Sequence, residues 1–352
     1  MKHPTLPAQR KGATVWYGPA MAAQPRPWLW QLSKDELHEL EAAAEPLVQG
    51  KADVGQLTAA DFPLPTLASK LAALQRELVQ GRGFSLIRGL PVGKYSEREA
   101  VTIFFGLGTH LGHARSQNAQ GHVLGHVRNA GLSSNDPRVR IYQTRERQTF
   151  HTDSTDVVGL LCMQPARRGG KSLLVSADTV FNEMRRQRPD LLRLLLEPIA
   201  TDRRGEVPQG MEPFLRIPVY SYYADQLTVF YQRQYIESAQ RFAEAPRLTE
   251  QHLAAMDLFD ALCNDPKIHL SMQLEKGDMQ FVYNHAMLHD RTGFEDWPEV
   301  ERRRHLLRLW LSVPGDRPLP PVFATRYGSV EVGNRGGIVV PGTDFCIPWD
   351  SE

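Results

Sequence analysis

The sequence predicts an α+β fold in which a double-stranded β-helix, or jelly roll, is covered by N-terminal and inserted helices. Helical patterns fill the first part of the chain, and many short strand patterns separated by Gly, Asn, Asp or Pro follow them. Strands and helices do not alternate regularly, which disfavours a parallel doubly wound sheet. The sequence also lacks the GxGxxG and P-loop motifs that would argue for nucleotide binding.

The length of 352 residues permits one large domain or two smaller ones. We expect a single domain in which residues 1–80 form a helical cover. Residues 81–352 would then form the jelly roll, ending in an extended C-terminal tail. No internal repeat or low-complexity segment suggests another arrangement.

Composition and charge exclude several kinds of partner. The formal net charge is +1 without a long block of one sign, so neither nucleic-acid binding nor membrane binding is expected. The three cysteines are far apart and form no CxxC pair, which argues against disulfides and thiolate zinc sites. No signal-peptide core and no run of about 18 apolar residues is present, so we expect a cytoplasmic protein. The extended tail leaves a homo-oligomer open.

The N-terminal part of the chain contains three helix signals. Ser33 followed by Glu36 is typical of a capping box at the start of a helix. An amphipathic pattern in TLASKLAALQRELVQG predicts a second helix, which Gly81 ends. SEREAVTIFFGLGTHLG predicts a third helix that ends at 106–108, and GFSLIRGLP predicts a buried strand before it. Residues 1–30, rich in Pro, Ala and Gly, are expected to be irregular.

Short strands dominate the middle and the end of the chain. They are expected over residues 123–128, 139–144, 148–151, 157–164 and 172–176. A helix over 178–196 should break near Pro189, strands return over 213–232, and a strong helix begins near Thr249. The strands HLSMQL, MQFVYN and RHLLRLWLS precede a Pro- and Gly-rich tail that begins at Arg317.

The stretch FHTD offers two metal-ligating side chains. Because side chains alternate across a strand, His151 and Asp153 would share one face and Thr152 would lie on the other. A third ligand must come from far away, and His285 and His289 in NHAMLHDRT are the candidates. Two His and one carboxylate with open positions form the facial triad of non-haem Fe(II) oxygenases.

The strand RHLLRLWLS carries arginines on a face where apolar residues are expected. Arg304, Leu306, Arg308 and Trp310 share this face, and His305 begins the other. A buried guanidinium is costly unless it is paired with an anion. Arginine is also suited to bidentate carboxylate binding, so this strand predicts an anchor for carboxylates of the protein or of a ligand.

Together these segments resemble a known family. FHTDSTDVVGLLCMQPARRGGKSLLVS, NHAMLHDRT and RHLLR, in this order, are similar to the Fe(II)- and 2-oxoglutarate-dependent dioxygenases of the taurine dioxygenase (TauD/TfdA-like) type. The resemblance spans about residues 80–312. It implies a clavaminate synthase-like jelly roll that uses Fe(II), with 2-oxoglutarate and O2 as cosubstrates.

The resemblance also implies roles for individual residues. His151, Asp153 and His289 match the iron ligands, which favours His289 over His285. Arg304 matches the arginine that grips the distal carboxylate of 2-oxoglutarate, and Ser172 falls where the family has a hydroxyl residue near that group.

Three further positions bear on the substrate and on the subgroup. Arg308 matches a second arginine that faces either the cosubstrate or an anionic substrate. Asn284 falls on an asparagine that precedes the distal histidine by five positions. His285 stands where taurine dioxygenases usually have arginine, and the segment from His289 to Arg304 is longer than in that subgroup. The substrate is therefore left open.

A histidine-rich stretch precedes the metal motif. It contains His110, His113, His122 and His126, without an accompanying acid or cysteine. We interpret it as a cleft-lining loop and expect substrate contacts from Arg115, Ser116, Gln117 or Asn118. Tyr142 and Gln148 are further candidates of the same kind.

The resemblance predicts an enzyme that hydroxylates a C–H bond of a small, possibly anionic, organic substrate. 2-Oxoglutarate would be decarboxylated to succinate and CO2 in the same reaction. The carboxylate at Asp153 favours hydroxylation over halogenation. The alternative is a non-catalytic, cupin-like jelly roll that binds a metal or a small anion, and the two strand arginines argue against it.

Overall fold

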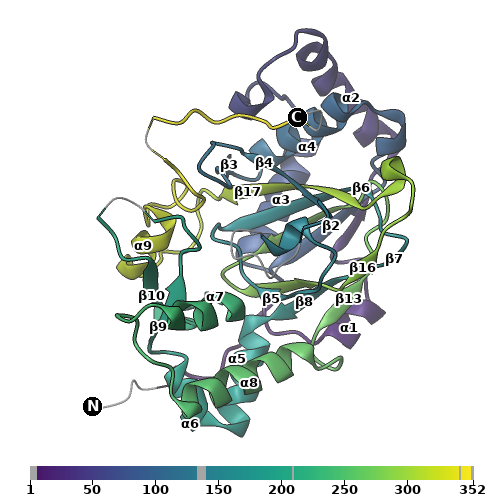
Figure 1. Cartoon of the computed structure of the whole chain (residues 1–352). Coiled ribbons are helices and arrows are strands. Elements are labelled where there is room, and N and C mark those ends of the chain that lie inside the picture. The colour runs from purple at the N-terminus through teal and green to yellow at the C-terminus, as the bar shows by residue number, and fades with distance from the viewer. Residues whose placement is uncertain (1–5, 133–139, 208–209, 341, 350–352) are drawn as a thin grey trace.

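Two β-sheets form the centre of the molecule. The computed structural model describes residues 6–132, 140–207, 210–340 and 342–349. The large sheet has the order β1-β2-β14-β6-β17-β3, with β4 also paired to β17, and the small sheet has the order β13-β8-β15-β5. Figure 1 shows the two sheets facing each other. Residues of both sheets line one pocket, as expected for a jelly roll.

Most of these strands lie where the sequence predicts them. The large sheet consists of β1 (Leu29–Gln31), β2 (Phe84–Arg88), β3 (His113–Ala114), β4 (Leu124–Arg128), β6 (Val157–Gln164), β14 (Met279–Tyr283) and β17 (His305–Ser312). The small sheet consists of β5 (Gln148–His151), β8 (Ser172–Ser176), β13 (Leu270–Met272) and β15 (Met287–Arg291). Three two-stranded sheets add β7 (Arg168–Gly169), β9 (Pro198–Asp202), β10 (Phe214–Pro218), β11 (Tyr220–Tyr223), β12 (Gln226–Val229) and β16 (Phe294–Glu295).

Helices cover both outer faces. One group, α2 (Lys34–Gln49), α3 (Leu67–Val79) and α4 (Glu97–Thr109), lies on the large-sheet side, where α3 contacts β2 and β14 and α4 contacts β17. The other group lies on the small-sheet side and consists of α5 (Ala177–Gln187), α6 (Pro189–Leu194) and α8 (Glu250–Asn264) (Figure 1). The shorter helices are α1 (Gly18–Ala23), α7 (Arg233–Ser238) and α9 (Ala324–Tyr327).

The capping signals in the sequence correspond to real helix starts. The Ser33 side chain accepts a hydrogen bond from the backbone N–H of Glu36, and the Glu36 carboxylate accepts one from the backbone N–H of Ser33. Thr249 caps α8 in the same manner. The expected break at Pro189 separates α5 from α6, because proline cannot donate the helical hydrogen bond.

Three local expectations are wrong. Residues 140–144 do not form a strand: Ile141–Gln143 is a 3₁₀ turn, and position 139 lies outside the described residues. The N-terminal 30 residues are not wholly irregular, because α1 and β1 begin there. Helix α4 continues through both glycines to Thr109, because the glycines leave room for close packing: a Cβ at Gly106 would meet the Phe62 ring at 2.4 Å.

Two short links carry the chain between the sheets. Residues 152–156 join β5 of the small sheet to β6 of the large sheet, and residues 284–286 join β14 of the large sheet to β15 of the small one. The links touch: Asn284 N donates to Asp156 O at 2.9 Å, and Asp153 N donates to Asn284 Oδ1 at 2.9 Å. The two halves of the predicted metal motif therefore meet at one place.

Candidate active site

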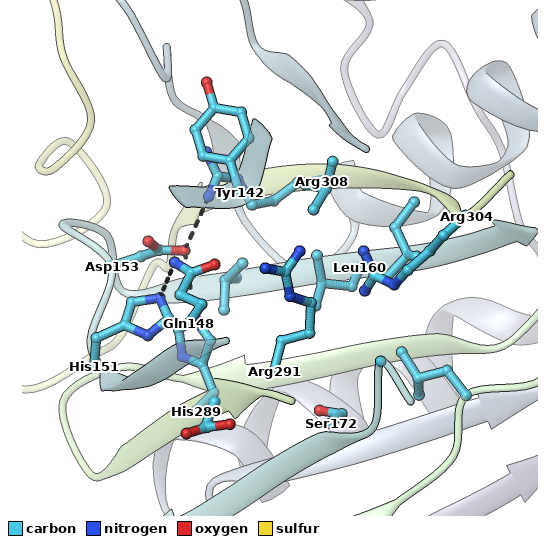
Figure 2. A pocket seen from close by; sticks show the side chains of 16 residues that line it. Tyr142, Gln148, His151, Asp153, Leu160, Ser172, His289, Arg291, Arg304 and Arg308 are labelled. Carbon is cyan, nitrogen blue, oxygen red and sulfur yellow. Dashed lines mark hydrogen bonds and ion pairs between the residues drawn. The ribbon is translucent and has the colours of Figure 1, made fainter. Parts of the chain in front are cut away.

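The side chains of His151, Asp153 and His289 converge at this junction. His151 ends β5 and lies opposite His289 of β15 in the strand register. One ligand atom from each of the three residues lies within 4.8 Å of the other two, and the side chains are largely buried. Figure 2 shows the three gathered at one end of a pocket. His285, the rival for the third position, is not part of this group.

The protonation of the two imidazoles suits a metal site. His151 Nδ1 lies 2.8 Å from Thr149 O, and because a carbonyl only accepts, Nδ1 must carry the proton. The Nε2 lone pair then points into the site, where the Gln148 amide nitrogen lies 2.8 Å away. Burial lowers the pKa of His151, and burial with repulsion from His151 lowers the pKa of His289 to about 3. Both imidazoles are therefore neutral near pH 7, as metal binding requires.

Asp153 is held in place as a carboxylate. Burial alone would raise its pKa, but Arg308, His289 and His151 lower it below the ordinary value. Trp310 Nε1 donates to Asp153 Oδ2 at 3.0 Å, and Arg308 Nη1 lies 3.8 Å from the same oxygen. Oriented neighbours of this kind fix a ligating carboxylate before the metal arrives.

An inner pocket extends from the three ligands between the two sheets. Arg304 lies at its far end, and Ser172 lies on its small-sheet wall (Figure 2). Ser172 Oγ donates to Gln280 Oε1 at 2.9 Å. Gly170 makes room for the guanidinium, since a Cβ there would meet Arg304 Nε at 3.2 Å.

Arg304, at the far end of the inner pocket, forms no ion pair with a carboxylate among the described residues. Its side chain makes no ion pair in those ranges, and the buried Arg304 Nη1 lacks a hydrogen-bond partner. Burial lowers the pKa of Arg304 to about 10, which still leaves it charged at neutral pH. A buried guanidinium in this condition is suited to pairing with an anion.

An outer chamber opens on the other side of the ligands. Its cavity volume is about 370 Å³, and it shares His151, Asp153, Tyr142, Gln148 and Arg308 with the inner pocket. The ligand group therefore lies between a smaller, mainly apolar compartment and a larger, more polar one.

The residues expected to contact substrate are only partly brought together. Asn118, Tyr142 and Gln148 line the outer chamber, and the Tyr142 ring lies 4.7 Å from the Arg308 guanidinium. Arg115 lines neither cavity, so its position does not match the expected contact: its Nε donates to Gly336 O at 2.9 Å. Gln117 lines the outer chamber and also holds Arg308, accepting from Arg308 Nε at 2.7 Å.

The family of the chain follows from comparison with known proteins. Residues 44–310 match the model of the family described as taurine catabolism dioxygenase TauD, TfdA family. The chain belongs to the TauD/TfdA family. It is therefore an Fe(II)- and 2-oxoglutarate-dependent dioxygenase, as the motif order predicts.

One relative is similar over most of the chain, and another over about half of it. FR-33289 synthase of Streptomyces rubellomurinus (strain ATCC 31215) is 31% identical over 324 residues, which is 90% of this chain and 94% of that protein. A uridine-5'-phosphate dioxygenase of a Streptomyces species is 30% identical over 177 residues, covering 48% of this chain and 62% of that protein.

Solved structures of TauD/TfdA-like oxygenases confirm the fold. An asparagine oxygenase in complex with Fe(II), hydroxyasparagine and succinate has a TM-score of 0.64 at 17% identity, covering 81% of this chain and 93% of that chain. The non-haem iron oxygenase OrfP with Fe and α-ketoglutaric acid gives 0.58 at 14% identity, covering 80% and 93%. The predicted double-stranded β-helix is correct.

Residues that sequence reasoning missed complete the site. Arg291, next but one to His289, lines the inner pocket beside Arg304 (Figure 2). Arg140, Glu206 and Arg326 line the outer chamber. Strand phase could have identified Arg291, because it lies on the same face of β15 as His289. No local signal marks the other three, which come from irregular segments and from the tail.

His285 belongs to a second, fully buried cluster. His285 Nε2 lies 2.8 Å from Asp156 Oδ1, and Arg335 contacts both Asp156 at 2.8 Å and Asp316 at 2.7 Å. Arg335 already supplies a cation to both carboxylates, so this cluster has no need of a metal. Because Asp156 belongs to one link and His285 to the other, the cluster ties the two links of the junction together.

The four histidines of residues 110–126 form hydrogen bonds with different parts of the chain. His110 bonds Phe62 O and His113 bonds Gly333 O, each within 2.8 Å. His122 contacts Asn118, and His126 contacts His305 and Pro348 O. Within the described part of the chain they form no metal-ligand group.

Proposed function

We propose that this dioxygenase hydroxylates a C–H bond of a small anionic organic substrate held in the outer chamber, coupled to decarboxylation of 2-oxoglutarate to succinate and CO2. The observation that carries the proposal is the position of the ligand group between two cavities with different linings. The inner pocket suits a dicarboxylate, and the outer chamber suits a larger polar molecule.

The residues at the junction fit an iron(II) ion. His151, Asp153 and His289 would hold it through two neutral imidazoles and one carboxylate, the donor set of a facial triad. Bound iron and 2-oxoglutarate supply the oxidising chemistry. The buried His289 Nδ1 has no hydrogen-bond partner among the described residues. If His289 held the metal through Nε2, the N–H at Nδ1 would need a water or another ligand as its acceptor.

The chain's own residues position the reactants. Arg304 would pair with the distal carboxylate of 2-oxoglutarate, and the Ser172 hydroxyl would lie beside it. Leu160 and Leu306 line the same pocket and exclude water from the reacting centre. Trp310 holds Asp153, so the carboxylate keeps its orientation while the substrate enters from the outer side.

Arg308 supports an anionic substrate. Its guanidinium lines both cavities, and its nearest carboxylate is Asp153, which would be occupied by the metal. A relative of this chain is named for action on uridine 5'-phosphate, which carries an anionic group. Tyr142 and Trp310 flank Arg308 at 4.7 and 5.0 Å and keep it extended toward the chamber.

The first experiment tests the metal and cosubstrate assignment. Anaerobic addition of Fe(II) and 2-oxoglutarate should give a weak visible charge-transfer band. His151→Ala should abolish the band, whereas His38→Ala, at an exposed position, should leave it unchanged. A band that survives in His151→Ala would reject this ligand assignment.

The second experiment tests the anchor and the reaction. Arg304→Ala should weaken 2-oxoglutarate binding about tenfold or more, because a charge-assisted pair is lost. The exposed neighbour offers a matched control, Arg303→Ala, which should bind normally. Mass-spectrometric screening of small anions should then find a +16 product that requires 2-oxoglutarate; products formed without it would contradict the proposal.

A further inference from the structure

The wall of the outer chamber carries a cluster of two arginines around one glutamate. Arg140 contacts Glu206 Oε1 and also donates to Tyr235 OH at 3.3 Å. Arg326 of α9 contacts Glu206 Oε2 at 3.2 Å. The side chains of Arg326 and Glu206 are only 11% and 16% exposed, so this cluster belongs to the cavity lining rather than to the outer surface.

The positive and negative side chains that line the chamber do not balance once Asp153 is assigned to the metal. Among the described lining residues, Arg140, Arg308 and Arg326 face Asp153, Asp202 and Glu206. Asp153 belongs to the ligand group, and Asp202 pairs with Arg241, outside the lining, at 3.2 Å. Only the carboxylate of Glu206 then remains in the described lining against three guanidiniums, and it contacts Arg140 and Arg326. The surplus is two positive charges, in a chamber with polar walls.

The cluster lies next to the reacting centre. Arg326 Nε donates to Ser154 Oγ at 2.7 Å, and Ser154 follows Asp153 directly in the chain. A substrate group held by Arg326 would therefore lie close to Asp153, one of the three residues that would hold the metal. The rest of a small molecule could then lie beside His151 and Asp153, which line the same chamber.

We propose that Arg140, Arg326 and Glu206 form a subsite for a doubly charged tetrahedral oxyanion of the substrate, such as a phosphate monoester or a phosphonate. This inference rests on the proposed function, and it identifies the class of the anionic substrate. Paired guanidiniums match the several oxygens of such a group. Two negative charges also match the two positive charges of Arg140 and Arg326, which Glu206 alone neutralises only in part.

Glu206 acts as a replaceable counter-ion in this subsite. Without it, Arg140 and Arg326 would repel each other in a partly desolvated wall. An incoming dianion takes over both guanidiniums and displaces the Glu206 carboxylate toward the solvent. Glu206 therefore competes with the substrate anion for the two guanidiniums. Its removal should strengthen anion binding, which can be measured.

Binding of matched probes tests the charge class. Phenylphosphonate, benzenesulfonate and benzoate share one ring and differ in the head group. Each is titrated calorimetrically into the full chain loaded anaerobically with Fe(II) and 2-oxoglutarate. Phenylphosphonate should bind about tenfold tighter than the two monoanions, and Arg326→Gln should remove that advantage. Equal binding of all three probes would overturn the proposal.

Substitution of the glutamate separates this proposal from a zwitterion site. Glu206→Gln should tighten phenylphosphonate binding several-fold, and the exposed control Glu212→Gln should not change it. If Glu206 instead received a substrate ammonium group, Glu206→Gln would weaken asparagine or arginine binding and leave phenylphosphonate unchanged. That result would reject the subsite.

The iron and 2-oxoglutarate band distinguishes failure of the subsite from failure of the proposed function. Arg140→Gln, Arg326→Gln and Glu206→Gln should all retain the band, because none of these residues lines the inner pocket. A retained band without phosphonate preference disproves only the subsite. An absent band in the wild-type chain would disprove the oxygenase assignment itself.

Discussion

The guanidinium of Arg308 is shared by two compartments, and its fixed position shows how single residues define this site. Gln117 accepts from its Nε and also donates to its backbone carbonyl, at 2.7 and 2.8 Å. Tyr142 and Trp310 flank it. Arg308 therefore cannot move toward either cavity, and a ligand must come to it.

Arg291 yields a prediction for cosubstrate binding. Burial and repulsion from Arg304 lower its pKa to about 9, and in the described ranges it has no carboxylate partner. It donates instead to the backbone of Thr144 and Glu146. A dicarboxylate would relieve both arginines, so Arg291→Gln should raise the dissociation constant of 2-oxoglutarate about tenfold.

Anaerobic titration of the charge-transfer band measures this constant. The control is Arg168→Gln, at an exposed position that does not line the pocket. Unchanged affinity in Arg291→Gln, with native unfolding behaviour, would show that Arg291 serves only to hold residues 144–146.

At the scale of elements, β17 divides two tasks between its faces. Leu307, Leu309 and Leu311 belong to the core beside the large-sheet helices, and a Cβ at Gly108 of α4 would meet Leu309 at 2.8 Å. Leu306 and Arg308 line the inner pocket. The period of two in the sequence assigns each residue to one task.

This division predicts separable effects in neighbouring residues. Leu309→Ala should lower the free energy of unfolding by about 2–5 kcal/mol, because it leaves a cavity in the core. The 2-oxoglutarate dissociation constant should stay within about twofold, since the side chain does not reach the pocket. Urea unfolding and band titration measure both, and a large loss of affinity at unchanged stability would contradict the assignment of faces.

The junction between residues 152–156 and 284–286 explains why the metal motif could be read from the sequence. His151 and Asp153 are close in the chain, and both reach the ligand group, but the expected shared strand face is wrong: β5 ends at His151, and Asp153 lies in the link that follows. The pairing of His151 with His289 depends on tertiary register, and only the family resemblance pointed to it. The choice between His285 and His289 is likewise made by the register.

At the scale of the whole molecule, the chain segment that follows β17 binds the junction between residues 152–156 and 284–286. Arg335 is fully buried and binds Asp156 and Asp316, and its backbone nitrogen donates to Ser312 Oγ at 3.0 Å. The tail therefore does more than extend over the surface, because it supplies a buried cation to the core. Sequence reasoning could not assign Arg335 or Arg326, because no pattern relates the tail to strands more than a hundred residues away.

Removal of this internal cation should destabilise the fold. Arg335→Met leaves two buried carboxylates without their partner, so the free energy of unfolding should fall by about 3–5 kcal/mol. Urea denaturation of the metal-free chain measures it. The exposed pair of Arg188 and Asp190 supplies a control, because Arg188→Met should give no measurable change.

The same cluster predicts a pH dependence. Burial alone would raise the pKa of Asp156, but the bond to His285 and the charge of Arg335 lower it below its unfolded value. Its contribution to stability is therefore present above the unfolded pKa of about 4 and is lost as the pH falls through the folded one. Asp156→Asn should flatten the acid limb of the unfolding free energy, and exposed Asp35→Asn should not.

The two cavities are built from different kinds of structure, and this gives the scaffold room to diversify. The inner pocket is lined mainly by strands of the two sheets, whereas the outer chamber adds Asn118, Arg140, Glu206 and Arg326 from connections and the tail. Such segments accept substitutions and insertions more readily than paired strands do. Descendants of one ancestral gene could therefore exchange substrates by remodelling these connections, while natural selection keeps the oxidising machinery unchanged.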